Sequence, residues 1–139
     1  MNTRTTLIDN EYACLWYYPD DGIIHHKFLQ PISDELFRNV LMTGLKILRE
    51  QGAQKWLSDD RNNSILQAED SAWSQDYWLP RAIDTNWRYW ALLEPEKKRA
   101  RINMDRLMGF VRDNTRVKVE IFPDPDEARQ WLIRQGKEK

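Results

Sequence analysis

The segment from Lys55 to Asn63 constrains the fold more than any other part of this chain. Lys55-Trp56-Leu57-Ser58 is short enough to be one buried strand, and it runs directly into Asp59-Asp60-Arg61-Asn62-Asn63. Short apolar runs bounded by polar residues are typical of strands that an α/β sheet buries on both faces. Ligands of such sheets bind in the crevice beyond the carboxyl ends of the strands. The sequence therefore predicts a central strand whose acidic pair emerges at the rim of the sheet, beside a site.

Length and charge exclude several classes of protein. A chain of 139 residues is one domain by the usual relation of length to domain number, and we expect a single domain over 1–139 with its core between about 12 and 132. Lysine and arginine total 21 against 22 acidic residues, which leaves no basic field to neutralise phosphates, so nucleic acid is not an expected partner. The amino terminus is polar and no stretch approaches the roughly 20 apolar residues of a membrane span. We expect a cytoplasmic protein with no membrane insertion.

Cysteine and histidine are too few for the common metal sites. The one cysteine, Cys14, lies in an apolar run, where a small buried thiol is expected, and it excludes a disulfide within the monomer. The two histidines, His25 and His26, are adjacent on an expected strand, so they point to opposite faces and cannot bind one metal through that spacing. We expect one of them to be packed and the other exposed, with a pH-responsive role as an alternative. No metal site and no cofactor is predicted.

Local patterns predict a hairpin followed by alternating helices and strands. The β-rich runs 12–18 and 22–28 flank Pro19-Asp20-Asp21-Gly22, which is a turn sequence. Ser33 can cap a helix with apolar residues at three-to-four spacing, and Gly52 ends it. Further expected elements are a strand at 55–58, a helix at 69–79 that Pro80 kinks or restarts, a strand at 87–93, a helix at 104–112, a strand at 117–122 and a helix at 124–132.

This order predicts an α/β fold. We expect a five-stranded mixed, mostly parallel sheet in which only the first strand runs antiparallel, with right-handed crossovers and four helices covering it.

Several segments of the sequence resemble those of a known family. Trp16-Tyr17 before the Pro-Asp-Asp-Gly turn, Lys55-Trp56-Leu57-Ser58-Asp59-Asp60-Arg61, Trp78-Leu79-Pro80 and the ending Phe122 to Leu132 are similar to the stand-alone bacterial STAS-like, or sporulation anti-sigma-antagonist-like, domains. The resemblance runs from about Tyr12 to Leu132. It implies a STAS-like fold and a non-catalytic protein-interaction or regulatory role, with a regulatory protein as a partner; related folds also carry lipids.

The chain departs from the regulatory branch of that family at one motif. Anti-sigma antagonists carry a phosphorylatable Ser or Thr after an Asp, commonly in Asp-Ser-Ser-Gly-Leu, and no such string exists here. The nearest hydroxyls are those of Ser58, at the strand end, and Ser64, in Asn62-Asn63-Ser64-Ile65. Ser64 is kept as a candidate phosphoacceptor.

The rim after the strand has more than one interpretation. Asp59, Asp60 and Arg61, with Asn62, can hold a polar ligand or a cation, because adjacent carboxylates repel unless a positive charge lies between them. An internal Asp–Arg pair and a solvent-facing run of charge are the alternatives.

Seven tryptophans are many for one small core. Trp73, Tyr77 and Trp78 share the second helix, and Trp90 lies in the following strand. Core packing explains any single ring, but together the rings favour a homodimer surface or an apolar ligand groove. Arg81 and Arg88 are near enough in sequence to stack on the rings or receive an anion.

Catalysis has no positive support. Nucleophile-elbow and phosphate-loop patterns are absent. The first hypothesis is therefore a non-catalytic STAS-like module, homodimeric through the aromatic-rich second helix. The second is a domain that binds an apolar small molecule or lipid in a pocket of Trp73, Trp78 and Trp90, with Asp59, Asp60 and Arg61 at its mouth. A hydrolase or isomerase with Asp59 or Asp60 as base is a third possibility.

Overall fold

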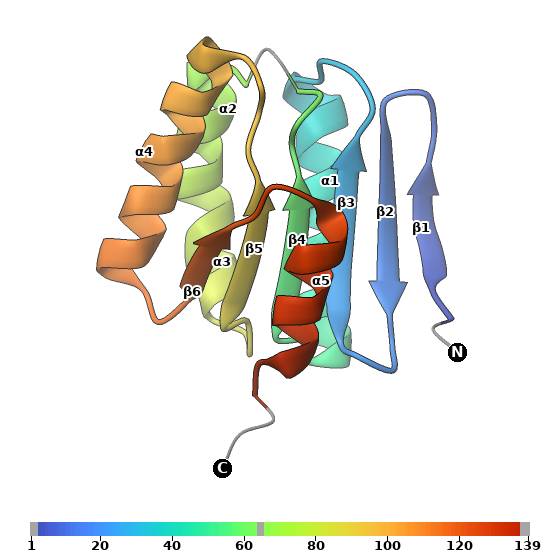
Figure 1. Ribbon diagram of the computed structural model, residues 1–139. Helices are drawn as coiled ribbons and strands as arrows, with labels where there is room; N and C mark the ends of the chain where they lie inside the picture. Colours follow the sequence, from blue (N-terminus) through green and yellow to red (C-terminus); the bar gives the residue numbers. More distant parts are fainter. Residues whose placement is uncertain (1–2, 64–65, 137–139) are drawn as a thin grey trace.

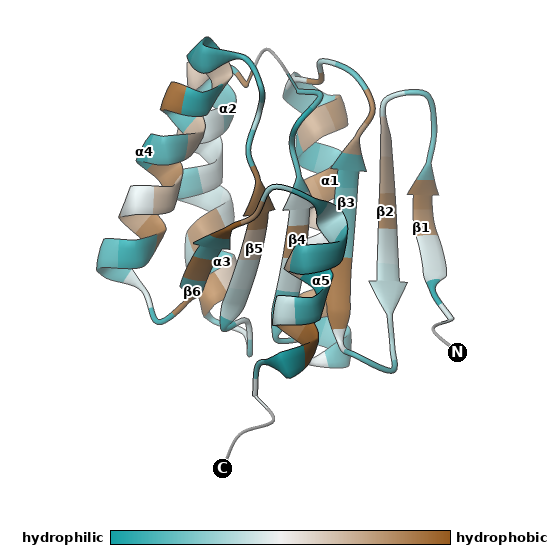
Figure 2. Ribbon diagram, in the orientation of Figure 1, coloured by the Kyte–Doolittle hydropathy of each residue, from teal (hydrophilic) through white to brown (hydrophobic). Residues whose placement is uncertain are grey.

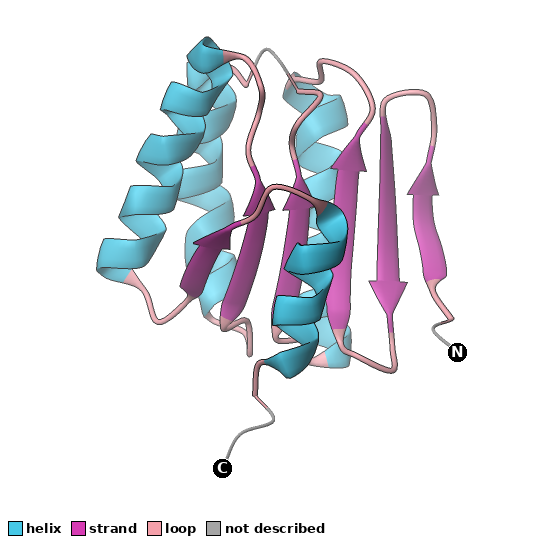
Figure 3. Cartoon of the chain, in the orientation of Figure 1, coloured by secondary structure: helices cyan, strands magenta, loops and turns pink. Residues whose placement is uncertain are grey.

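A computed structural model describes residues 3–63 and 66–136. Its centre is a six-stranded sheet in the order β1-β2-β3-β4-β5-β6, with helices on both faces (Figure 1). Three helical segments lie against one face and the last helix lies alone against the other (Figure 3). The α/β class and the mixed sheet agree with the sequence prediction.

The strand number of five was too low, because Thr5–Asp9 forms a first strand, β1. It pairs antiparallel with β2, Ala13–Tyr18, and a bulge shifts the register between Thr6 and Ile8. Asn10 closes the turn between them, since its side-chain oxygen accepts the backbone N–H of Tyr12 and Ala13 at 2.8 and 3.0 Å. The residues of β1 do not alternate between apolar and polar as those of a half-buried strand do. The sequence pattern therefore did not predict this strand.

The hairpin prediction is confirmed. β2 pairs antiparallel with β3, Ile23–Phe28, across a turn in which Gly22 has a φ of 66° and donates its N–H to the carbonyl of Tyr18 at 2.8 Å. Only glycine adopts such a φ without strain. β3 then pairs parallel with β4, Lys55–Asp59, which pairs parallel with β5, Tyr89–Leu93, and β5 with β6, Lys118–Ile121. β2 alone therefore runs against the other strands.

Crossover handedness explains the unequal layers. The sheet grows in one direction from β3 to β6, so right-handed crossovers place every connecting helix on the same face. These are α1, Asp34–Gln51, the helical segment from Ala68 to Ile83, and α4, Lys98–Asn114. The final helix α5, Pro125–Arg134, is no crossover, and it covers β4 and β5 from the other side (Figure 1).

The second helical segment contains a wide turn just before its proline. It comprises α2, Ala68–Trp73, the π-helical turn η1, Ser74–Trp78, and α3, Leu79–Ile83. Pro80 has no N–H to donate and its ring would collide with a carbonyl one turn earlier. The π turn widens the helix there, so Pro80 restarts the helix without ending it.

The predicted cap of α5 is confirmed, whereas the predicted cap of α1 is wrong. Asp124 caps α5 as predicted, because its Oδ1 accepts the N–H of Glu127 at 2.9 Å and Pro125 begins the helix. Ser33 precedes α1 but its side chain makes no capping hydrogen bond. The carboxylate of Asp70, from α2, accepts the N–H of Asp34 at 3.2 and 3.3 Å in its place.

Apolar side chains gather in two layers, one on each face of the sheet. The hydropathy colouring shows the polar outer faces of α4 and α5 against the less polar strands (Figure 2). The larger layer lies between the sheet and α1, α2 to α3 and α4, and the smaller lies under α5. The larger layer contains four buried tryptophans: Trp56, Trp78, Trp87 and Trp90.

Candidate functional site

Asp59, the last residue of β4, and Asp60, which follows it, are not exposed at the rim of the sheet. Asp59 and Asp60 are each 2% exposed, so the prediction of a surface acidic pair was wrong. Successive residues of an extended chain point to opposite faces, and here the two carboxylates enter different layers. Each carboxylate forms hydrogen bonds with a different side chain, Asp59 with Arg61 and Asp60 with His26, and these bonds offset the cost of burial.

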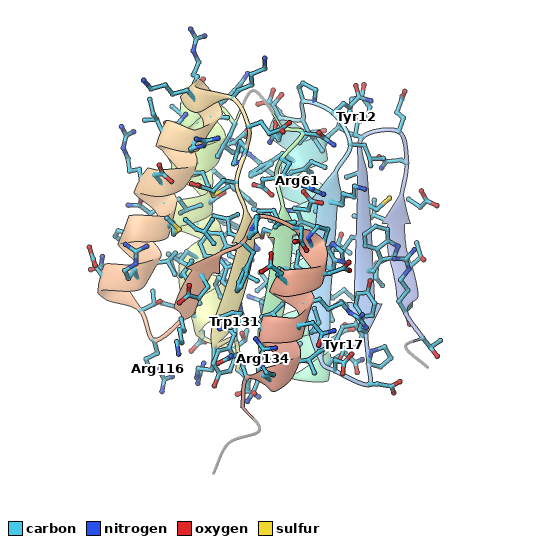
Figure 4. The ribbon with its side chains drawn as sticks, in the orientation of Figure 1. Tyr12, Tyr17, Arg61, Arg116, Trp131 and Arg134 are labelled. Carbon is cyan, nitrogen blue, oxygen red and sulfur yellow. The ribbon has the colours of Figure 1, made fainter. Side chains whose placement is uncertain are left out.

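Asp59 is held by Arg61. The guanidinium donates from Nε to Oδ1 and from Nη2 to Oδ2, both at 2.9 Å. The hydrogen bond with Asp59 is the main reason that the pKa of Arg61 is raised. Figure 4 shows Arg61 between the end of β4 and the start of α5, on the face of the smaller layer. This two-bond pair uses both carboxylate oxygens, so Asp59 and Arg61 stabilise the loop.

Asp60 is bonded to a histidine of the neighbouring strand. Its Oδ1 lies 2.6 Å from Nε2 of His26, and Nδ1 of the same ring lies 2.9 Å from the indole Nε1 of Trp56. An indole nitrogen can only donate, so Nδ1 must accept and the ring proton must be on Nε2. His26 is therefore a neutral imidazole that donates to the carboxylate of Asp60. Both ring nitrogens are occupied.

This polar chain forms one end of an apolar cavity of about 40 Å³. The cavity lies between the sheet and the helices of the larger layer, and it exceeds the roughly 10–15 Å³ that one water molecule needs. Its lining residues come from β3, β4, β5, the loops next to β4 and β5, and all three covering helical segments: His26, Phe28, Phe37, Leu41, Trp56, Ser58, Asp60, Leu66, Ser74, Trp78, Leu79, Trp87, Trp90, Met104, Leu107 and Val111.

The four tryptophans of the cavity wall contact one another through inclined rings. Centroid distances run from 5.3 Å for Trp56 and Trp78 to 6.4 Å for Trp56 and Trp87. The planes are inclined by 58° to 86°. In such inclined contacts the positive edge of one ring lies towards the negative face of the next, which is electrostatically favourable and holds the rings in place.

All four indole N–H groups are already bonded within the protein. Trp56 donates to His26, and Trp90 donates to the hydroxyl of Ser58 at 2.8 Å. The other two donate to backbone carbonyls: Trp78 to Leu41 at 2.7 Å and Trp87 to Tyr89 at 3.0 Å. A ligand in the cavity can therefore contact only the carbon edges and π faces of these rings.

The other candidate residues are dispersed. Asn62 is exposed, and Ser64 lies outside the described residues. Trp73 does not line the cavity: it stacks on Tyr77 at a centroid distance of 5.6 Å, and the guanidinium of Arg38 lies 5.2 Å from its ring. The structure thus brings Asp60, Trp78 and Trp90 together and separates them from Asp59, Arg61, Asn62 and Trp73.

Sequence reasoning missed His26, Trp56, Ser58 and Trp87 as lining residues. A signal for three of the site residues was available, because Trp56, Ser58 and Asp60 alternate along β4 and so share a face, whereas Asp59 is out of phase. No local signal pointed to His26 or Trp87, since the strand pairing and the covering helices bring them to the cavity.

Among the described residues, His26 is not free to act as the base of a serine–histidine pair. Such a base accepts a proton at Nε2, but in His26 that atom carries a proton and donates to Asp60. His25 lies on the other face against Trp16, and burial lowers its pKa to about 3. The expectation that one histidine is exposed was wrong, because both are buried.

Cys14 is half-buried, and burial raises the pKa of its thiol, which disfavours the reactive thiolate. Within residues 3–63 and 66–136, no three histidine, cysteine or acidic side chains gather closely enough to hold a metal ion.

None of the helices in the described part of the chain has the length and apolar character needed to cross a membrane. Comparison of the chain with known proteins finds no matching family model, no similar curated protein and no similar solved structure.

Proposed function

We propose that this protein is a non-catalytic module that binds a small, mostly apolar molecule in the tryptophan-lined cavity. The observation that carries the proposal is the arrangement of the cavity. Its walls are apolar and aromatic, while His26, Ser58 and Asp60 concentrate polar atoms at one end. Ligand sites in proteins have this composition, with a few placed polar groups in an apolar enclosure.

The location in the fold supports the same proposal. His26, Ser58 and Asp60 lie at the carboxyl ends of the parallel strands β3 and β4, where open α/β sheets bind ligands. The helical cover includes the π turn η1, which contributes Ser74 and Trp78 to the lining. π turns occur often at functional sites.

Size limits the ligand. A volume of about 40 Å³ is well below the several hundred Å³ of sites for drug-sized molecules. The ligand is therefore compact, or the helical cover moves outward to admit a larger one.

A matched pair of variants tests the proposal. Leu107 lines the cavity from α4, and Leu107→Phe fills part of it; Leu36, on α1 and 45% exposed, receives the same change away from the cavity. Native mass spectrometry and indole N–H resonances would be followed while a panel of small apolar molecules is added. We expect bound molecules to shift the indole signals of the wall, and Leu107→Phe to weaken binding roughly tenfold while Leu36→Phe does not. Unchanged indole signals across the panel would contradict the proposal.

A second function, contact with another copy of the chain, is favoured by one surface. Trp73 and Tyr77 stack on the outside of the second helical segment, and Arg81 lies 3.7 Å from the ring of Tyr77. Aromatic and arginine side chains are enriched at protein interfaces. An exposed acidic side chain, Asp76, lies on the same segment, and another, Glu35, lies in α1, so a second copy can offer carboxylates to Arg81.

Light scattering after size exclusion tests this second function. We expect a dimer that Tyr77→Asp dissociates, whereas Tyr12→Asp, at the far end of the sheet, leaves it intact. A monomer at tens of micromolar would remove this proposal without affecting the first. From the sequence resemblance we also propose membership of the STAS-like family and a regulatory protein partner, and from the sequence pattern a cytoplasmic location.

A further inference from the structure

We propose that the cavity selects a small organic cation, with its positive charge beside Asp60 and its alkyl groups against the tryptophan rings. This inference rests on the proposed binding function and adds the charge class of the ligand. It comes from the electrostatics of the polar end and from what the aromatic walls present.

The first argument is that the charge of Asp60 is buried and has a neutral partner. Within the described residues, the side chain bonded to its carboxylate is His26, which the indole N–H of Trp56 holds in its neutral form. The adjacent cation, Arg61, is bonded to Asp59 in the other layer. A carboxylate that is 2% exposed without a positive partner is costly, so a cation in the cavity would be favoured.

The second argument is that the walls attract positive charge. With all four indole N–H groups bonded internally, the rings have no free polar atom to present to a ligand in the cavity. The face of an aromatic ring carries negative potential, and tryptophan binds cations most strongly of the aromatic side chains.

The third argument excludes the opposite charge. An anion in the cavity would meet the carboxylate of Asp60 and would find no indole N–H to donate to it. Among the described lining residues, the remaining hydroxyls are those of Ser58 and Ser74, and that of Ser74 donates to the carbonyl of Asp70 at 2.8 Å. Fatty acids and phosphorylated ligands are therefore disfavoured.

Three compounds of similar shape and different charge test the inference: tetramethylammonium, tert-butyl alcohol and trimethylacetate. Titration calorimetry and indole N–H resonances would measure binding to the full chain. We expect tetramethylammonium to bind at least about tenfold more tightly than the alcohol, and trimethylacetate to bind most weakly. This ranking needs no variant, so it does not depend on the folding of a mutant.

Asp60→Asn removes the charge and keeps an oxygen that can accept from His26. We expect it to weaken tetramethylammonium binding about tenfold and to leave the alcohol unchanged. Asp59→Asn is the matched control, because Asp59 faces the other layer and its loss leaves the preference intact.

The outcomes separate this inference from the proposed function. If the alcohol or the carboxylate binds as tightly as the cation and Asp60→Asn changes nothing, the cation preference is overturned while binding itself stands. If none of the three compounds nor the wider panel shifts the indole signals of the wall, the binding function fails, and the inference fails with it.

Discussion

Gly44 of α1 lies so close to the indole ring of Trp56 that a Cβ atom there would be 2.1 Å from Cη2. Glycine is therefore required by packing, although it weakens a helix relative to alanine. We expect Gly44→Ala to lower the free energy of unfolding by about 1–3 kcal/mol, because a shift of the indole would strain its hydrogen bond to His26 and its contacts with Trp78 and Trp87. Urea denaturation measures this change.

Gly109 of α4 provides the control for that prediction. A Cβ there has no heavy atom within 4 Å, so Gly109→Ala gains helix propensity without a collision. We expect it to raise the free energy of unfolding by roughly 0.5–1 kcal/mol. Equal effects at the two glycines would contradict the packing argument.

The cap of α1 is supplied from another helix, and this can be tested with two alanine variants. Asp70 accepts the N–H of Asp34 and its Oδ1 lies 3.6 Å from Nε of Arg38, whereas the side chain of Ser33 makes no capping bond. We expect Asp70→Ala to destabilise the fold by about 1–3 kcal/mol and Ser33→Ala by a few tenths. Thermal unfolding compares them, and the reverse ranking would show that Ser33 caps the helix.

Glu94 should make the protein less stable as the pH rises. Burial, followed by the neighbouring carboxylate of Asp105, raises its pKa to about 7 from 4.5. The folded state therefore holds a proton that the unfolded state loses, so this stabilisation is complete below about pH 4.5 and is lost through about pH 7. We expect Glu94→Gln to match the wild type at about pH 5 and to melt a few degrees higher at about pH 8. Parallel melting curves across this range would refute the assignment.

His25 should act at lower pH and in the other direction. Burial lowers its pKa to about 3 from 6.5, so the unfolded chain takes up a proton that the folded chain refuses. Its stabilisation is present above about pH 6.5 and is lost as the pH falls towards 3.

A phenylalanine at position 25 keeps the ring contacts with Trp16 and Tyr18, loses the 3.5 Å hydrogen bond between Nδ1 and the hydroxyl of Tyr18, and removes the titration. We expect His25→Phe to be more stable than the wild type by on the order of 2 kcal/mol at about pH 4 and close to it at about pH 7. Denaturation at the two pH values decides, and a difference that does not change with pH would show that His25 does not titrate in this way.

Strong local patterns were enough to predict most of the fold. The apolar spacing in α1 and the Asp124–Pro125 start of α5 each specify their element through neighbouring residues alone. The sequence analysis did not predict β1, because Thr5 and Thr6 are both exposed on this edge strand and the bulge interrupts the alternation of its side chains. Its strand state depends on pairing with β2, which its own residues do not reveal.

The candidate site was predicted only in part, for a related reason. Two aspartates and an arginine in succession suggest solvent, because charges are rarely buried without partners. The partner of Asp60 is 34 residues away on β3, and the four tryptophan rings of the cavity come from β4, η1, β5 and the loop before β5. The alternation of side chains along β4 and into Asp60 could have separated the two aspartates, since it places Asp60 on the same face as Trp56 and Asp59 on the opposite face.

The place of α5 as the last element, alone on its face, has a consequence for biosynthesis. The strands occupy the sheet in the order in which a ribosome makes them, so each can join its predecessor during translation. Leu57, Ala91 and Leu93 are covered by Ala128 and Leu132, which are made after all of these strands. Until α5 leaves the exit tunnel, that side of the nascent sheet exposes apolar side chains, so synthesis that stops before residue 125 would leave a product prone to aggregation.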